Sequence, residues 1–313
     1  MSAETSHPPR PDPSAICHPP SAIGLTRIAL IGDLHLFSLW PMPWHMLSKR
    51  VLGQSNLWLN RRKVFRHHRL HELIDKAIDL KPDMVLCSGD LTTTALQSEF
   101  ETARRFLAPL AEVAPLVAVP GNHDKYTFTA ARSKRMQRML PGWVPDTFPH
   151  TRPINAGWDL LALDAAIPRV KDAVGRLGAQ QLDSVAATLR GRDPARGLVV
   201  LCHYPCVVPH GIHEHDSHRL ADAPQLRKLL EQHTDAGARV VYIHGHIHRP
   251  WYVQPGADPD RGGDANGGVP FTCINAGAPC MVDPDHPLGQ GFGELILPDD
   301  PAASLVVRRH MLD

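Results

Sequence analysis

The chain has 313 residues, and its 33 Lys and Arg residues nearly balance its 32 Asp and Glu residues, for a formal net charge of +1. This balance does not favour a nucleic-acid-binding protein, whose surface would be strongly basic. The longest apolar runs, such as residues 198–201, are too short to cross a bilayer, and no secretory signal is visible, so we expect a soluble cytoplasmic protein.

Residues 1–24 are expected to form a disordered tail, because the six prolines among the first 20 residues deny the backbone regular hydrogen bonds. Residues 25–313 are predicted to form a single domain, in which short β-rich runs alternate with amphipathic helices. The predicted strands lie at 28–31, 84–87, 116–119, 160–163, 198–202 and 240–243, and the predicted helices at 66–80, 99–110, 179–189 and 223–232. This alternation indicates an α/β fold whose helices cover the sheet faces.

The C-terminal part changes character and is predicted to be mostly strand. The predicted strands lie at 251–253, 271–274, 293–297 and 304–308, with little helix between them. A surface loop is expected at 254–270, which holds five glycines.

Polar clusters follow five of the predicted strands directly. They are Gly32-Asp33-Leu34-His35, Ser88-Gly89-Asp90, Pro120-Gly121-Asn122-His123-Asp124, His203-Tyr204-Pro205 and His244-Gly245-His246-Ile247-His248. Ligands of an open α/β sheet bind outside the carboxyl ends of its strands. We therefore expect the five clusters to converge on one site.

The residue types in these clusters favour metal coordination. Histidine is abundant, at 20 residues, and neutral imidazole is the commonest metal ligand. A mixed nitrogen and oxygen set without thiolates suits divalent or trivalent Mn, Fe, Zn or Co better than Ca. Seven candidate ligands are too many for one ion and suit two ions that share a carboxylate.

The ordered set of motifs, over residues 27–248, resembles the calcineurin-like metallophosphoesterase superfamily. Leu163-Asp164, followed by Gly175-Arg176-Leu177-Gly178 and Gln181-Leu182, is similar to the branch that contains cyclic-nucleotide and glycerophosphodiester phosphodiesterases. The resemblance implies a four-layer α/β/β/α sandwich, in which two mixed sheets pack together between flanking helices.

The resemblance also implies a role for each matching residue. Asp33, His35 and His248 would hold one ion; Asn122, His203 and His246 would hold the other; and Asp90 would bridge the two. His123 would lie beside the leaving group and protonate it. Asp124 would orient His123. A metal-bridging hydroxide would attack phosphorus in line with the leaving oxygen.

The expected function is hydrolysis of a small phosphoester, with a phosphodiester favoured. The alternative is a phosphomonoesterase or a hydrolase of a nucleotide or lipid pyrophosphate. A non-catalytic metal-binding scaffold would be expected to have lost His123 or several ligands, and the sequence retains all of them.

A basic, Trp-rich segment near residues 37–66 has two open interpretations. From Leu34 to His71 there is no acidic residue, and three of the six tryptophans, Trp40, Trp44 and Trp58, lie in this stretch with Arg61, Arg62 and Lys63. The segment could cap the site and bind an anionic substrate or a lipid headgroup, as a peripheral membrane contact. Equally, the tryptophans could be core anchors and the arginines a solvated helix face.

A second His-rich stretch, residues 207–218, follows His203. It contains His210, His213, His215 and His218. The stretch could contribute an extra ion or substrate contacts, but a mobile polar loop is the favoured interpretation, and these histidines are not assigned as ligands.

Overall fold

The computed structural model describes residues 24–38, 65–209, 212, 214–255, 271–282 and 290–312. Four predicted features lie outside the described residues: residues 1–23 of the expected disordered tail, most of the basic Trp-rich segment, residues 256–270 of the expected Gly-rich loop, and His210 and His213. None of the helices in the described ranges is both long and apolar enough to cross a membrane.

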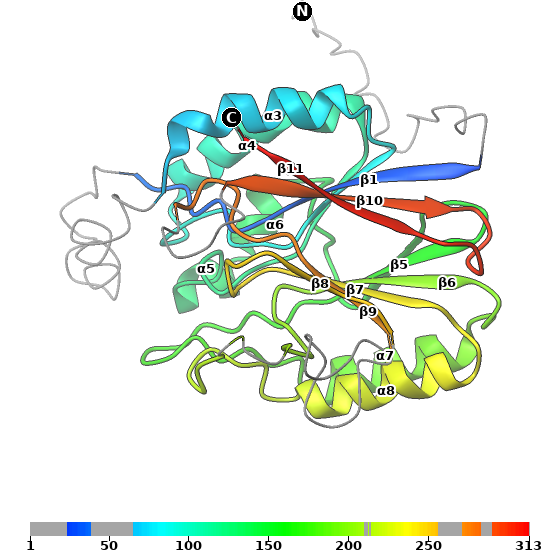
Figure 1. Cartoon of the computed structure of the whole chain (residues 1–313). Helices are drawn as coiled ribbons and strands as arrows, with labels where there is room; N and C mark the ends of the chain where they lie inside the picture. The colour runs from blue at the N-terminus through cyan, green and yellow to red at the C-terminus, as the bar shows by residue number, and fades with distance from the viewer. Residues whose placement is uncertain are drawn as a thin grey trace, which may run out of the picture.

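Two β-sheets pack against each other in the middle of the molecule (Figure 1). The first sheet has the strand order β11-β10-β1-β2-β3, and the second has the order β4-β5-β6-β7-β9-β8. Both sheets are mixed: β1, β2 and β3 are parallel and β10 is antiparallel to β1, while β5, β6, β7 and β9 are parallel and β4 and β8 are antiparallel. The strands are β1 (Leu25–Ile31), β2 (Met84–Cys87), β3 (Leu116–Ala118), β4 (His150–Pro153), β5 (Trp158–Ala162), β6 (Gly197–Leu201), β7 (Val240–His244), β8 (Trp251–Val253), β9 (Thr272–Asn275), β10 (Gly291–Pro298) and β11 (Val306–Met311).

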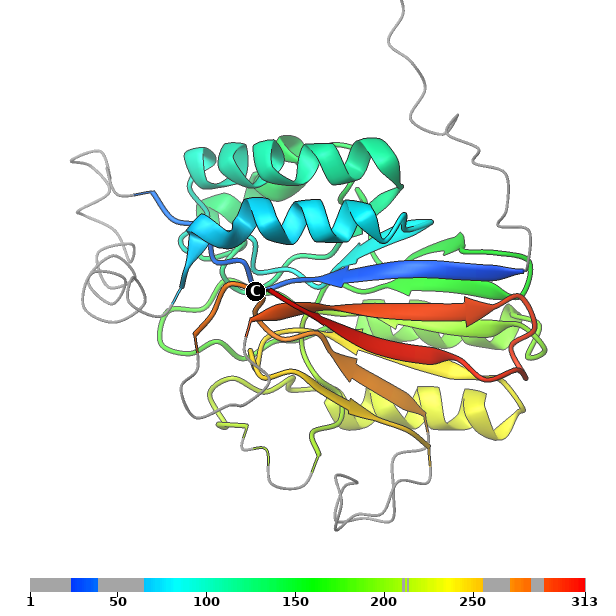
Figure 2. The same cartoon turned by 45° about the horizontal axis from the view of Figure 1, so that its top comes forward.

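Helices cover the outer face of each sheet, so the predicted four-layer α/β/β/α sandwich is confirmed. Figure 2 shows α3 and α4 over the first sheet, with α8 beneath the second sheet. The described helices are η3 (His67–Arg69), α3 (Leu70–Asp79), α4 (Gln97–Val113), α5 (Phe128–Arg132), α6 (Arg135–Met139), α7 (Ala179–Gly191) and α8 (Ala223–Asp235).

Alternating side chains of the central strands supply the apolar layers. On β1, Ile28 and Leu30 face the second sheet, whereas Ala29 and Ile31 pack with the side chains of α3 and α4. A third cluster joins the second sheet to α7 and α8. Burying one large aliphatic side chain contributes roughly 1.5–3 kcal/mol, so these layers fix the strands that carry the polar clusters.

Sequence periodicity did not predict β4, α5 or α6. β4 is an edge strand whose residues are all partly exposed or exposed, and it ends at Pro153. α5 and α6 have five residues each, too short to show a helical repeat.

The parallel strands bring the loops that follow them together at one edge of the sandwich. β1 and β2 end side by side, with Ile31 paired to Cys87, and β6 and β7 end side by side, with Leu201 paired to Ile243. The clusters that follow them therefore project from the same edge of the sandwich, on the left in Figure 1. We call this edge the carboxyl edge.

Candidate metal centre

The loops at the carboxyl edge adopt an uncommon backbone conformation. Eight described residues other than glycine have a positive φ, and five of them are predicted ligands: Asp33 at 51°, His35 at 47°, Asp90 at 50°, His246 at 73° and His248 at 65°. Such a conformation costs on the order of 1–3 kcal/mol per residue and persists only where the surroundings impose it. Its concentration here therefore indicates a functional site.

Backbone hydrogen bonds impose this conformation on the first two loops. The amide of Asp33 donates to the carbonyl of Gly89 at 2.9 Å, and the amide of His35 donates to the carbonyl of Asp90 at 2.9 Å. The pairing of β1 with β2 thus continues past the strand ends, which holds the two loops against each other.

Asp33, His35, Asp90 and His248 form the first donor group. Each offers one donor atom, and the four atoms lie within 4.8 Å of one another. The Nε2 atoms of His35 and His248 are 2.8 Å apart. His35 Nε2 lies 3.6 Å from Asp90 Oδ2, and His248 Nε2 lies 3.7 Å from Asp33 Oδ1.

Asp90, His203 and His246 form the second donor group, whose donor atoms also lie within 4.8 Å of one another. His203 Nε2 lies 3.4 Å from Asp90 Oδ2 and 3.2 Å from His246 Nδ1. Asn122 Oδ1 lies 3.2 Å from His203 Nε2, which brings the amide into the same group. The structure thus brings all seven predicted ligands together, with Asp90 in both groups.

Backbone carbonyls select the ring nitrogen that each histidine of the second group presents. Since a carbonyl only accepts, the Nδ1–H of His203 donates to the Ser88 carbonyl at 2.8 Å, and the Nε2–H of His246 donates to the His218 carbonyl at 2.7 Å. This leaves Nε2 of His203 and Nδ1 of His246 as the ring nitrogens that face the group, an arrangement typical of metal-bound histidine.

Two glycines allow the backbone to approach the carboxylates. A Cβ on Gly121 would lie 2.1 Å from Asp90 Oδ1, and a Cβ on Gly245 would lie 2.3 Å from Asp33 Oδ2. Any side chain at these positions would therefore displace a candidate ligand.

The carboxylates of the site are buried close together. Asp33 is fully buried, and Asp90 and Asp124 are 1% exposed. Burial and then Asp90 raise the pKa of Asp33 to about 7, against the opposing charge of His203. Burial also acts to raise the pKa of Asp90, but the imidazoles around it, led by His203 and His123, hold that pKa well below its usual range.

The pKa of His203, the histidine beside Asp90, is shifted in the opposite direction to the pKa of Asp90. Burial alone would lower the pKa of His203, but the Asp90 carboxylate outweighs burial and raises that pKa to about 9. In the described part of the chain, the main charges acting on Asp33 and Asp90 come from histidines and other aspartates rather than from Lys or Arg. Buried carboxylates with neighbouring imidazole nitrogens form a donor set that fits transition-metal cations.

His123 and Asp124 lie beside this set. The amide of His123 donates to Asp90 Oδ1 at 2.8 Å, and its Nδ1–H donates to the Thr93 carbonyl at 2.6 Å. The Asp124 carboxylate accepts from the amide and hydroxyl of Thr92, both at 3.0 Å, and from the amide of Gly121 at 3.1 Å. Asp124 therefore ties the loop after β3 to the loop after β2.

Several contributing groups could not be identified from the sequence. The carbonyls of Ser88, Thr93 and His218 act through the backbone, which every residue has. Thr92 follows the Ser88-Gly89-Asp90 motif by two positions and carries no signal of its own. His218 contributes its carbonyl, while its Nδ1 lies 2.8 Å from the Ser217 hydroxyl.

The second stretch of resemblance has a structural role. Gln181 accepts from the Asp164 amide at 3.0 Å and donates to the Asp164 carbonyl at 2.8 Å. Asp222 accepts from the amides of Leu177 and Gly178, at 3.1 and 2.8 Å. These contacts fix the connection between β5 and α7.

Comparison with protein families agrees with this geometry. A family model described as calcineurin-like phosphoesterase matches residues 26–250. No curated protein sequence matches the chain significantly.

Solved structures share the fold at low sequence identity. A dimetal phosphatase from Danio rerio is similar with a TM-score of 0.60 and 15% identity, over 91% of this chain and 95% of that chain. A purple acid phosphatase from yellow lupin (Lupinus luteus) seeds is similar with a TM-score of 0.57 and 14% identity, over 92% of this chain and 51% of that chain. At these identities the likeness concerns the fold alone.

Proposed function

The chain belongs to the calcineurin-like phosphoesterase family, and from this premise we propose that it is a phosphodiesterase with a dinuclear metal centre. The observation that carries the proposal is the presence of Asp90 in both donor groups. One carboxylate reaching two adjacent donor groups is what a two-ion hydrolase requires.

Each ion would have its own ligands. Asp33, His35 and His248 would hold one ion, Asn122, His203 and His246 would hold the other, and Asp90 would contribute to both. When bound, the ions would lower the pKa of a water molecule and neutralise the phosphoryl oxygens.

The chain itself would manage the leaving group. Because Nδ1–H of His123 donates to the Thr93 carbonyl, the neutral ring has no proton on Nε2. The imidazolium form of His123 would therefore be the one that gives an Nε2 proton to the departing alkoxide. The amide of His123, held by Asp90, keeps the ring at the edge of the donor groups. Asp124 would act as a positioning residue, since it anchors this loop through Thr92 and Gly121.

The charge around the site favours a diester over a monoester. A phosphodiester carries one negative charge, whereas a monoester approaches two near neutral pH. Lys125, which directly follows Asp124, is the lysine next to the site in the sequence, and its ammonium is already paired with the Asp164 carboxylate rather than left for a second phosphate charge. The alternative, a monoesterase or pyrophosphate hydrolase, gains support only if the basic segment near 37–66 supplies that charge.

Hydrolysis of bis-p-nitrophenyl phosphate against p-nitrophenyl phosphate tests the proposal. Protein stripped with a chelator and refilled with Mn²⁺ is expected to favour the diester, and Asp90→Asn is expected to lose about 10³-fold or more in kcat/KM, a barrier change of about 4 kcal/mol. Asp183→Asn, an exposed substitution on α7, is the matched control and should retain full activity.

Two outcomes would contradict parts of the proposal. Faster turnover of the monoester would favour the alternative. Activity that survives Asp90→Asn would reject the shared-carboxylate centre.

A further inference from the structure

A cavity of about 340 Å³ lies between α7 and α8, and residues of both helices line it. Because α7 ends at Gly191 shortly before β6 begins, and α8 ends at Asp235 shortly before β7 begins, this cavity lies at the edge of the sandwich opposite the carboxyl edge. We propose that it is a second binding site, the anion site, which takes a small organic monoanion with an apolar body. The anion site is separate from the candidate metal centre, so the inference goes beyond the proposed function.

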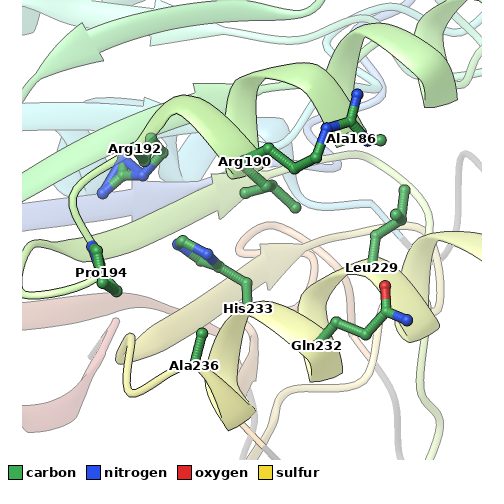
Figure 3. Close-up of a pocket in the computed structure, with 9 residues that line it drawn as sticks. Ala186, Arg190, Arg192, Pro194, Leu229, Gln232, His233 and Ala236 are labelled. Atoms are coloured by element: carbon green, nitrogen blue, oxygen red, sulfur yellow. The ribbon is translucent and has the colours of Figure 1, made fainter.

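Two buried nitrogen atoms at this cavity have no hydrogen-bond partner among the described residues. They are Nε2 of His233, a residue that is 6% exposed, and Nε of Arg192, whose side chain is 10% exposed. Figure 3 shows the His233 ring in the space between the helices, with Arg192 at one end of the cavity. Since His233 lines the cavity, a turn of its ring brings a nitrogen to a ligand there. A buried polar group without a partner costs free energy, so a bound acceptor would stabilise this end of the cavity.

The end of the cavity near Arg192 has an excess of positive charge. Arg192 and Arg196 share a single carboxylate, that of Asp159, at 2.8 and 2.6 Å. One carboxylate balances one guanidinium, so the charge of one arginine is left over. Arg190, which is exposed on α7, adds another cation to the lining.

The charge at the cavity matches a single negative charge. Among the described residues of the lining there is no Asp or Glu, and the nearby Asp193 and Asp235 are exposed outside it. The C-terminal ends of α7 and α8 carry about half a negative charge each, which offsets roughly one of the two positive charges. The remaining positive charge fits a monoanion better than a phosphomonoester, which approaches two negative charges near neutral pH.

The helix ends do not need these side chains as caps. At the end of α7, the amide of Arg192 donates to the Leu189 carbonyl at 3.4 Å, and at the end of α8, the amide of Ala238 donates to the His233 carbonyl at 3.2 Å. Backbone groups thus satisfy carbonyls that side chains would otherwise cap. The nitrogens of Arg190 and His233 therefore remain for a ligand.

Apolar side chains form most of the rest of the lining. They are Ala186, Leu189, Pro194, Leu229 and Ala236. A hydrocarbon group gains free energy when it leaves water for such a surface. A ligand rich in hydroxyl groups fits poorly, because Gln232 is the only amide or hydroxyl side chain among the described residues of the lining. A charged head with a short hydrocarbon body matches this distribution.

Three probes separate the head of the ligand from its body: hexanoate, acetate and hexanamide. The protein is loaded with Zn²⁺, and the NMR signal of the Arg192 Nε–H group is followed, so that binding at the metal centre is not counted. Hexanoate is expected to bind about tenfold more tightly than acetate, which lacks the apolar body. It is also expected to bind about tenfold more tightly than hexanamide, which lacks the charge.

The same titration has a second readout at His233. Burial and then the charge of Arg192 lower the pKa of His233. A carboxylate beside the ring favours the imidazolium form. Hexanoate is therefore expected to raise the pKa of His233, and hexanamide to leave it unchanged.

His233→Leu distinguishes a ligand site from a structural contact. Leucine fills a similar space without an unpartnered nitrogen, so this variant should raise the Tm of the ligand-free protein by about 2 °C. It should also weaken the binding of hexanoate about tenfold. His68→Leu, an exposed substitution on η3, is the matched control and should leave the Kd of hexanoate unchanged.

Each contrary result rejects a defined part of the argument. Equal Kd values for hexanoate and hexanamide would overturn the anionic head, and equal values for hexanoate and acetate would overturn the apolar body. Unchanged Arg192 and His233 signals in the presence of hexanoate would overturn the anion site altogether. A lower Tm for His233→Leu, with the binding of hexanoate retained, would assign His233 to packing. None of these measurements depends on turnover, so their failure is distinct from a failure of the proposed function.

Discussion

The two edges of the sandwich give their aspartates different partners, arginines at one edge and histidines at the other. At the edge where the parallel strands begin, Asp159 accepts from Arg192 at 2.8 Å and from Arg196 at 2.6 Å. A hydrogen bond from Arg196 lowers the pKa of Asp159. At the carboxyl edge, burial raises the pKa of Asp33 to about 7.

This difference separates carboxylates that stabilise the fold from carboxylates that serve a ligand. Asp159 gains its partners from arginines within the chain, so it contributes to folding. Asp33 and Asp90 are held by strained backbone among histidines, so a cation would stabilise them more than the chain does. Substitutions at the carboxyl edge should therefore impair function more than stability, and those at the opposite edge should do the reverse.

Replacement of His123 should have the largest effect among the substitutions that leave all seven predicted ligands in place. His123→Gln is expected to lower kcat by roughly 10²–10⁴-fold for diesters with an alkyl leaving group, because an alkoxide needs a proton. The loss should be much smaller for a p-nitrophenolate leaving group, which departs without a proton. Steady-state kinetics with both leaving groups measures the difference. Equal losses would assign His123 to positioning rather than to proton transfer.

Two glycine substitutions compare the edges directly. Gly245→Ala places a methyl group 2.3 Å from Asp33 Oδ2 and 2.8 Å from Ser88 Oγ, so it should weaken metal binding and destabilise the protein by about 1–3 kcal/mol. At Gly191, the last residue of α7, a Cβ meets nothing within 4 Å. Gly191→Ala should stabilise the protein by about 0.5–1 kcal/mol.

Calorimetric metal titration and thermal unfolding test both variants. If Gly245→Ala binds Mn²⁺ as tightly as the wild type does, Asp33 is not constrained in the way the structure indicates.

The sequence predicted the architecture because apolar periodicity and strand-end motifs are local signals. The strands 84–87 and 251–253 were predicted with the bounds that the structure has. Edge strand β4 was not predicted, because its side chains alternate between partial and full exposure and lack an apolar face. Short elements of this kind are fixed by their neighbours rather than by their own residues.

The candidate site was predictable in its residue types but not in its geometry. Spacing identified Asp33, Asp90 and His246 as candidate ligands, but no sequence pattern indicates that all three adopt a positive φ. The carbonyl partners of His203 and His246 are also invisible in sequence, since they depend on loops brought together by the two sheets.

A small effect is also expected at the opposite edge, where Asp159→Asn removes the charged partner of Arg192 and Arg196. The pKa of Asp159 is lower in the folded than in the unfolded chain, so its contribution is present above the unfolded value, about 3.9. It is lost as the pH falls through the folded value. Because the pair is partly exposed, the loss at pH 7 should be roughly 1 kcal/mol, with activity unchanged. Thermal unfolding from pH 7 down to pH 2, beside Asp183→Asn, should show the difference in Tm from the wild type shrinking as the pH falls. A difference that stays constant with pH would mean that Asp159 stabilises this edge by packing rather than by charge.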